Sequence, residues 1–195
     1  MTPDVRRLLV GSYGPPRGSG PGITLVEHDR EAGTLRAVGT AVRTPSPSAL
    51  AASADGRTLF AVEERGDGAV HSFRWDGEAR LGKVSSRASG GADPCHLLVH
   101  PSGRWVLGSN RGDDSIVVFS IAPSTGKMTL VGFTKTGGKT PRDFTFDPIG
   151  TWLYAADQDS SLVVPFRFDA DSGSLTALGG AVTVSNASFV GVYAL

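Results

Sequence analysis

The stretch that decides the fold is PSALAASADGRTLF (47–60), because the chain repeats its pattern twice. The pattern returns as PCHLLVHPSGRWVL (94–107) and again as PRDFTFDPIGTWLY (141–154). The glycines of the three copies fall at 56, 103 and 150, so the period is 47 residues both times. Each copy holds a short apolar run, a turn of Gly, Pro, Asp and Ser, and a second apolar run, as expected of two paired strands.

Two more apolar runs complete each repeat. The third runs are VHSF (70–73), IVVF (116–119) and VVPF (163–166), and the fourth runs begin at Leu81, Met128 and Leu175. Four short strands in a unit of this length are typical of a β-propeller blade, in which strands A to D run outward from a central channel. The pattern therefore predicts an all-β propeller of about four four-stranded blades.

The ends of the chain complete the strand count. Residues 7–11, 22–26 and 34–38 correspond to strands B, C and D, and residues 188–193 lie one period after the A strand that begins at Pro141. The expected order is BCD, three ABCD units and a final A, with this last strand completing the first blade and closing the ring. The chain is expected to form a single domain of four blades, at residues 1–43 with 187–195, 44–90, 91–137 and 138–186.

Composition narrows the class of protein. The 195 residues carry 19 basic and 19 acidic side chains, so there is no net field to hold nucleic acid or an acidic membrane. No apolar run approaches the ~18 residues of a membrane span, and no signal-peptide pattern follows Met1. One cysteine excludes an internal disulfide or a cysteine-cluster metal site. We expect a cytoplasmic protein that needs no metal or cofactor.

Propeller geometry indicates where chemistry would lie. Residues that open strand A and close strand B gather at one mouth of the channel, and loops on one face of a rigid scaffold often bind ligands. His96 and Arg142 open A strands, whereas Glu64 and Arg111 follow B strands. His96 or Glu64 is the candidate base that activates water, and Arg111 and Arg142 are the candidate binders of an anion or oxyanion. The predicted substrate is a small anionic ester or lactone.

Each of these residues also has a structural interpretation. His96 can hydrogen-bond at the start of a strand, and Glu64 can be a charged turn residue. Arg111 and Arg142 can pair with neighbouring aspartates. Cys95 is interpreted as an inert small residue, since no partner set for a nucleophile is legible.

Several longer motifs resemble a known family. GGADPCH (90–96), SNRGDDSI (109–116), GKTPRDF (138–144), VGSY (10–13) and AVEERGDGAV (61–70) are similar to motifs of the bacterial lactonase family that includes 6-phosphogluconolactonase. The resemblance covers nearly the whole chain. It implies a longer, seven-bladed propeller from which about three middle blades are missing here.

The resemblance also implies a function. Arg111 lies in the family's own Ser-Asn-Arg motif, while His96, Arg142 and Glu64 occupy equivalent positions of other blades. The implied activity is hydrolysis of a sugar lactone such as 6-phosphogluconolactone in the pentose phosphate pathway. The alternative is a non-catalytic propeller remnant or interaction scaffold, since fold alone does not determine function. Self-association of incomplete propellers is a further expectation.

Overall fold

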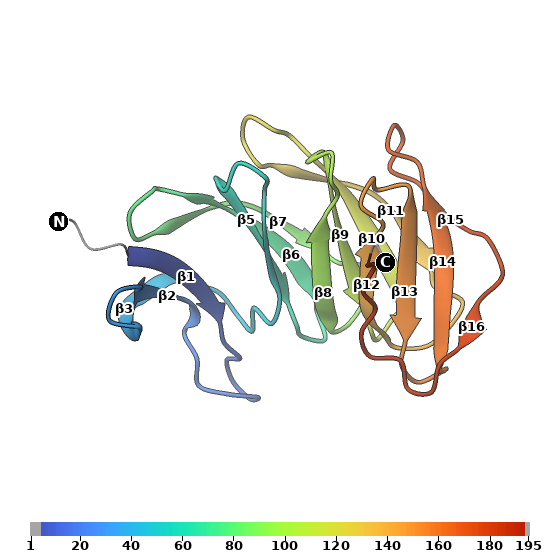
Figure 1. Ribbon diagram of the computed structural model, residues 1–195, viewed down its shortest axis with the longest axis horizontal. Coiled ribbons are helices and arrows are strands. Elements are labelled where there is room, and N and C mark those ends of the chain that lie inside the picture. The colour runs from blue at the N-terminus through green and yellow to red at the C-terminus, as the bar shows by residue number, and fades with distance from the viewer. Residues whose placement is uncertain (1–4, 194–195) are drawn as a thin grey trace.

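A computed structural model describes residues 5–193 as an all-β chain of four antiparallel sheets (Figure 1). Blade 1 is β1 (Val5–Gly11), β2 (Gly22–Asp29) and β3 (Thr34–Arg43); blade 2 is β4 (Leu50–Ala52), β5 (Thr58–Glu63), β6 (Ala69–Trp75) and β7 (Leu81–Ala88). Blade 3 is β8 (Pro94–Val99), β9 (Trp105–Asn110), β10 (Ser115–Ile121) and β11 (Met128–Lys135); blade 4 is β12 (Pro141–Phe146), β13 (Trp152–Asp157), β14 (Leu162–Phe168) and β15 (Leu175–Ala177), with β16 (Val182–Thr183) also on β14. The predicted all-β propeller fold is confirmed, and blades 2 to 4 each contain the four expected strands A to D.

The repeated glycines make the turns between strands A and B. Gly56, Gly103 and Gly150 have φ angles of 67°, 70° and 77°, a left-handed conformation that glycine adopts without steric cost. In each turn the glycine N–H donates to the carbonyl of the residue three positions earlier, at 2.8 to 3.0 Å. The 47-residue period therefore reflects one turn geometry used three times.

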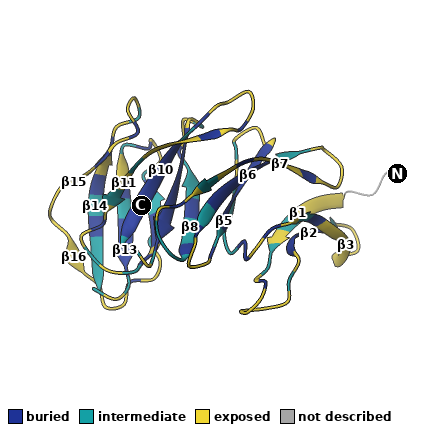
Figure 2. Cartoon of the chain, turned by 180° about the vertical axis from the view of Figure 1, so that it is seen from behind, coloured by how far each residue is buried: buried dark blue, intermediate teal, exposed yellow. Residues whose placement is uncertain are grey.

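Apolar residues hold neighbouring blades face to face. Between blades 3 and 4, Leu107 and Ile116 pack against Phe144 and Phe166, all of them almost fully buried. Similar clusters lie between blades 2 and 3, around Phe60, and between blades 1 and 2. Burial of apolar area is the main favourable term in folding, so the stack of blades is the core. Figure 2 shows β10 and β13 largely buried and β1 and β3 largely exposed.

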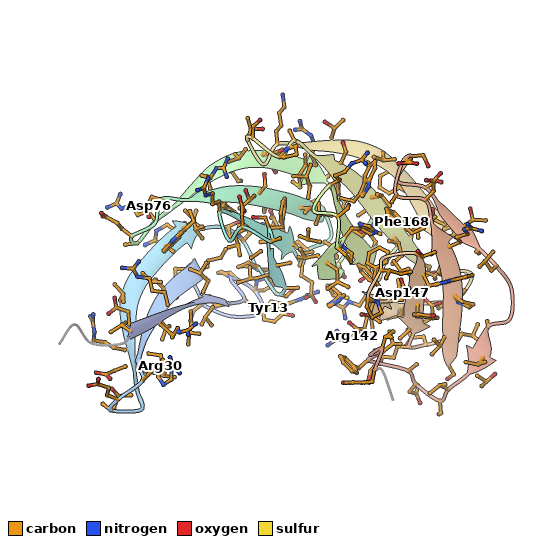
Figure 3. The ribbon with its side chains drawn as sticks, turned by 45° about the horizontal axis from the view of Figure 1, so that its top comes forward. Tyr13, Arg30, Asp76, Arg142, Asp147 and Phe168 are labelled. Atoms are coloured by element: carbon orange, nitrogen blue, oxygen red, sulfur yellow. The ribbon has the colours of Figure 1, made fainter. Side chains whose placement is uncertain are left out.

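The predicted closure of the ring by residues 188–193 is wrong. The four blades form an open arc (Figure 3), and within residues 5–193 the sheet of blade 1 has three strands, with β1 at one edge. Residues 188–193 form no strand and lie instead near blade 4, where the Val190 N–H donates to Asp143 Oδ2 at 2.8 Å. The physical reason is that blades 1 and 4 stand at opposite ends of the arc. Residues 1–4 and 194–195 of the predicted first blade lie outside the described residues.

Within residues 5–193 no helix is long and apolar enough to cross a membrane.

Candidate functional site

The inner strands β4, β8 and β12 pack side by side along the concave side of the arc. A residue with positive φ precedes each of them: Ser46 (40°), Asp93 (50°) and Thr140 (60°), again 47 residues apart. The carbonyl of each accepts a hydrogen bond from the backbone N–H of the residue that follows strand B. Those donors are Glu64 (3.1 Å), Arg111 (3.3 Å) and Gln158 (3.0 Å). This repeated bond fixes the predicted B-strand closers beside the A-strand openers.

Glu64 and Arg111 meet in a charged group that we call the Glu64 cluster, made of Tyr13, Arg17, Glu64, Asp93 and Arg111. The Glu64 side chain is only 4% exposed, and its Oε1 accepts from Arg111 and, at 2.8 Å, from Arg17. The Tyr13 hydroxyl donates to Oε2 at 2.8 Å. Arg17 also donates to Asp93 Oδ1 at 2.7 Å. Two guanidinium groups therefore balance two carboxylates.

The cluster joins three blades and changes the properties of its members. Tyr13 and Arg17 come from the β1–β2 loop of blade 1, Glu64 from blade 2, and Asp93 and Arg111 from blade 3. Burial, followed by the hydrogen bond to Glu64, raises the pKa of Tyr13, whereas the hydrogen bond to Asp93 chiefly raises the pKa of Arg17. A hollow of about 210 Å³ opens beside the cluster, lined by Arg17, Glu64 and residues next to them.

His96 lies in a second group, on blades 3 and 4. Its Nε2 is 3.1 Å from Asp143 Oδ1, and its ring meets Phe144 edge-on with centroids 5.0 Å apart. Burial lowers the pKa of His96, against the opposing effect of the Asp143 charge. A lowered pKa favours the neutral imidazole, in which one ring nitrogen can accept a proton.

Cys95 connects the two groups. Its Sγ lies 3.4 Å from the Arg142 carbonyl, and the charges of Arg111, Glu64 and Arg142 all act on it. Burial nevertheless dominates and raises the pKa of the Cys95 thiol, which fits the expected inert residue. Arg142 itself is exposed, and its guanidinium makes no hydrogen bond or ion pair with residues 5–193.

The structure thus places the four predicted residues in two neighbouring groups. Glu64 and Arg111 form a direct ion pair, and His96 contacts Asp143. Arg142 is open to solvent on the concave side of the arc, which Tyr13 also lines (Figure 3). Sequence analysis missed Tyr13 and Arg17 as site residues. The VGSY motif was a usable signal for Tyr13, but Arg17 lies in a Gly- and Pro-rich loop that has no counterpart in the other repeats.

Comparison with known proteins identifies the family of this chain. Residues 7–108 and 97–192 each match the family described as "Lactonase, 7-bladed beta-propeller". A curated relative, "Probable 6-phosphogluconolactonase" of Arthroderma benhamiae, is 29% identical over 111 residues, which is 56% of this chain and 28% of the relative's length. The matched part of this chain thus spans well under half of that relative.

Two solved structures share the fold. A protein from Lactobacillus plantarum has a TM-score of 0.58 at 20% identity, covering 92% of this chain and 67% of its own. Sqt1 from Saccharomyces cerevisiae has a TM-score of 0.61 at 12% identity, covering 72% and 36%. At such low identity these likenesses show the propeller fold alone. The family match spans nearly all the described residues, and the chain therefore belongs to the lactonase family of seven-bladed β-propellers.

Proposed function

We propose that this chain is a carboxylic ester hydrolase that opens the ring of a sugar lactone. The leading substrate of this proposal is 6-phosphogluconolactone. The reaction would belong to cytoplasmic carbohydrate metabolism, specifically to the pentose phosphate pathway. Membership of the lactonase family supports the reaction class. The observation that carries the proposal is the contact between His96 of β8 and Asp143 of β12, two neighbouring inner strands. Strand β12 also carries Arg142, which is exposed and has no side-chain partner among residues 5–193.

His96 is the better of the two candidate bases. Lactone hydrolysis needs a group that takes a proton from water as the water oxygen attacks the carbonyl carbon. A neutral imidazole in contact with a carboxylate suits that task, because the carboxylate stabilises the imidazolium that forms. Both oxygens of Glu64 already accept hydrogen bonds, two of the three from guanidinium groups. We therefore assign Glu64 to positioning Arg17 and Arg111.

The arginines supply the positive charge. When water adds to the lactone carbonyl, a negative charge develops on its oxygen, and a guanidinium within hydrogen-bond distance stabilises it. The ring C–O bond then breaks and its oxygen takes up the proton, giving the hydroxy acid. Arg142 has no competing side-chain partner among residues 5–193, so it can bind the oxyanion or the substrate phosphate in a bidentate manner. Arg111 contributes from the Glu64 cluster.

The test is hydrolysis of 6-phosphogluconolactone, followed as proton release at constant pH and compared with spontaneous opening of the ring. We expect catalysis above that background, with a loss of ~10²-fold or more in kcat for His96→Gln and an increase in KM for Arg142→Ala. Comparison with the unphosphorylated gluconolactone shows whether substrate binding depends on the phosphate.

Matched controls separate the site from general damage. His28→Gln on β2 and Arg57→Ala in the β4–β5 turn remove the same side-chain types at positions outside the concave site. Both should keep wild-type rates. Hydrolysis no faster than the spontaneous reaction, for the wild-type chain and for both lactones, would refute the enzyme and favour the alternative of a non-catalytic scaffold.

A further inference from the structure

The inner edge of blade 1 is open. Within residues 5–193, β1 pairs with β2 alone, so its other edge carries backbone groups without a strand partner. The Ser12 N–H donates to the Gly22 carbonyl across this pair at 3.0 Å. Because bonding alternates along an antiparallel pair, the N–H groups of Leu9 and Gly11 point away from β2. Such an edge readily accepts another strand.

The face of the blade 1 sheet that points away from blade 2 is also exposed to solvent. Leu8 and Val10 are 41% and 47% exposed, and they lie on the face opposite Leu9, which packs toward blade 2. In blade 3 the equivalent face carries Val106 and Phe119, both fully buried against blade 2. Blade 1 therefore presents apolar side chains where the other blades receive a neighbour.

Blade 4 presents the complementary face. Trp152 stands one period after Trp105, which packs in the core between blades 3 and 4 and is 6% exposed; Trp152 is 38% exposed. Val163 likewise stands one period after Ile116, which is fully buried in that core. The face of blade 4 that points away from blade 3 thus carries the same kinds of residue that form the three blade-to-blade interfaces within the chain.

Residues 188–193 form no strand, but they lie beyond blade 4 at the position that the repeat gives to an inner strand. The segment follows Pro141 by one period, and the Val190 N–H bonds to Asp143 on the adjacent inner strand β12. Phe189 and Tyr193 are 71% and 76% exposed. Among the described residues, blade 1 has no inner strand, while blade 4 is followed by a segment at an inner-strand position that pairs with no sheet.

We propose that two copies of this chain close into one ring of eight blades, in which residues 188–193 of each copy become the inner strand of blade 1 of the other. Blade 4 of each copy then packs on the open face of blade 1 of its partner. Each copy makes the same two contacts, and the assembly closes as a dimer, and does not extend as a filament, when each arc of four blades spans half of the ring. The proposal is independent of catalysis, since it rests on strand edges and blade faces alone.

The repeat gives the strand register. In blade 3, His96 pairs with Ser109, Leu98 with Leu107 and Val99 with Val106. Ile116 pairs with Ser109, and its counterpart Ile23 pairs with Gly11, so Ser109 corresponds to Gly11. The corresponding pairs across two copies are Val190 with Gly11, Val192 with Leu9 and Tyr193 with Leu8. The last is a non-hydrogen-bonded pair, whose Cα atoms approach to ~4.5 Å, within the range of a disulfide.

The first test is the mass of the full chain in solution, measured by light scattering over a range of concentrations. We expect a species of twice the chain mass of 20.2 kDa. Leu8→Lys together with Val10→Lys should convert it to monomer, because both side chains are exposed and charges on an open strand block pairing. A wild-type monomer at every concentration, or a series of growing oligomers, overturns the proposal.

The second test is covalent and uses a Cys95→Ser background. Leu8→Cys combined with Tyr193→Cys should oxidise to a disulfide-linked dimer on a non-reducing gel. Leu9→Cys with Tyr193→Cys is the matched control, since a shift of one residue turns the side chain to the other face, and it should give little cross-linking. A monomer carrying an internal Leu8–Tyr193 link, or equal cross-linking of both pairs, overturns the two-copy ring.

Discussion

Replacing Asp157 by Asn should stabilise the protein, and the repeat explains why. Asp157 closes β13 of blade 4, one period after Asn110 in blade 3. Asn110 Nδ2 donates to the Ser89 carbonyl at 2.7 Å. Asp157 Oδ1 accepts from the Thr136 hydroxyl at 2.7 Å, but its buried Oδ2 has no hydrogen-bond partner among the described residues. An amide at 157 would offer a donor where the carboxylate leaves an acceptor unsatisfied.

The expected size of the effect comes from the ionisation of Asp157. Burial raises its pKa from 3.8 to about 6, with the charge of Asp114 adding to the increase. Each pKa unit corresponds to ~1.4 kcal/mol, so keeping Asp157 ionised in the folded state costs about 3 kcal/mol. The folded state holds its proton to higher pH than the unfolded state does. Stability therefore falls as pH rises from about 4 to 6 and stays low above that range.

Thermal unfolding at pH 4 and pH 8 provides the assay. At pH 8, Asp157→Asn should raise Tm by roughly 6–12 °C, at about 2–4 °C per kcal/mol for a chain of this size. At pH 4 the gain should be below about 1 kcal/mol, because wild-type Asp157 is then mostly protonated when folded. Asp171→Asn, an exposed position, is the control and should change Tm little at either pH. An equal gain at both pH values, or a loss at pH 8, would refute the reasoning.

Two further substitutions test the turn geometry and the Glu64 cluster. Gly150→Ala should destabilise the protein by ~1–3 kcal/mol more than Gly103→Ala, as measured by urea denaturation. Both residues have positive φ, but only a Cβ atom at position 150 would clash, since it would lie 2.2 Å from His100 Nε2. Equal losses of stability would contradict this contact. Glu64→Gln should cost about 1–3 kcal/mol, since it leaves two guanidinium groups without their shared carboxylate. Glu27→Gln, which breaks a more exposed ion pair, should cost less than about 1 kcal/mol in the same measurement, and a reversed order would contradict the role of burial.

The blades were predictable because one repeat carries most of the information needed to build one. Turn glycines at 56, 103 and 150 mark the hairpins, and the apolar runs between them alternate as half-buried strands do. Closure was not predictable in the same way. A period in sequence places residues 188–193 at the position of a strand A, but the rotation from blade to blade decides whether that strand reaches β1. That rotation depends on side-chain packing between sheets, which the spacing does not encode.

The candidate site was predictable only in part: the sequence indicated four of its positions but not the residues that contact them. Positions 64, 96, 111 and 142 were found because repeat-equivalent positions share a backbone environment, as the bonds from Glu64 and Arg111 to the residues before strand A demonstrate. Their partners were not found by this route. Arg17 reaches Glu64 from an irregular loop, and a loop without a counterpart in the other repeats offers no register from which to infer a contact.

The Glu64 cluster and Arg142 differ in their contacts, and this difference indicates different roles within the site. The Glu64 cluster connects three blades, so any substrate anion that binds Arg111 must compete with a buried carboxylate already bonded to it. Arg142 faces no such competitor among the described residues, and it precedes the aspartate that holds His96. A ligand can therefore gain charge-assisted hydrogen bonds from Arg142 without breaking an existing pair. We therefore propose that the Glu64 cluster is chiefly structural and that substrate binds at the neighbouring inner strands β8 and β12.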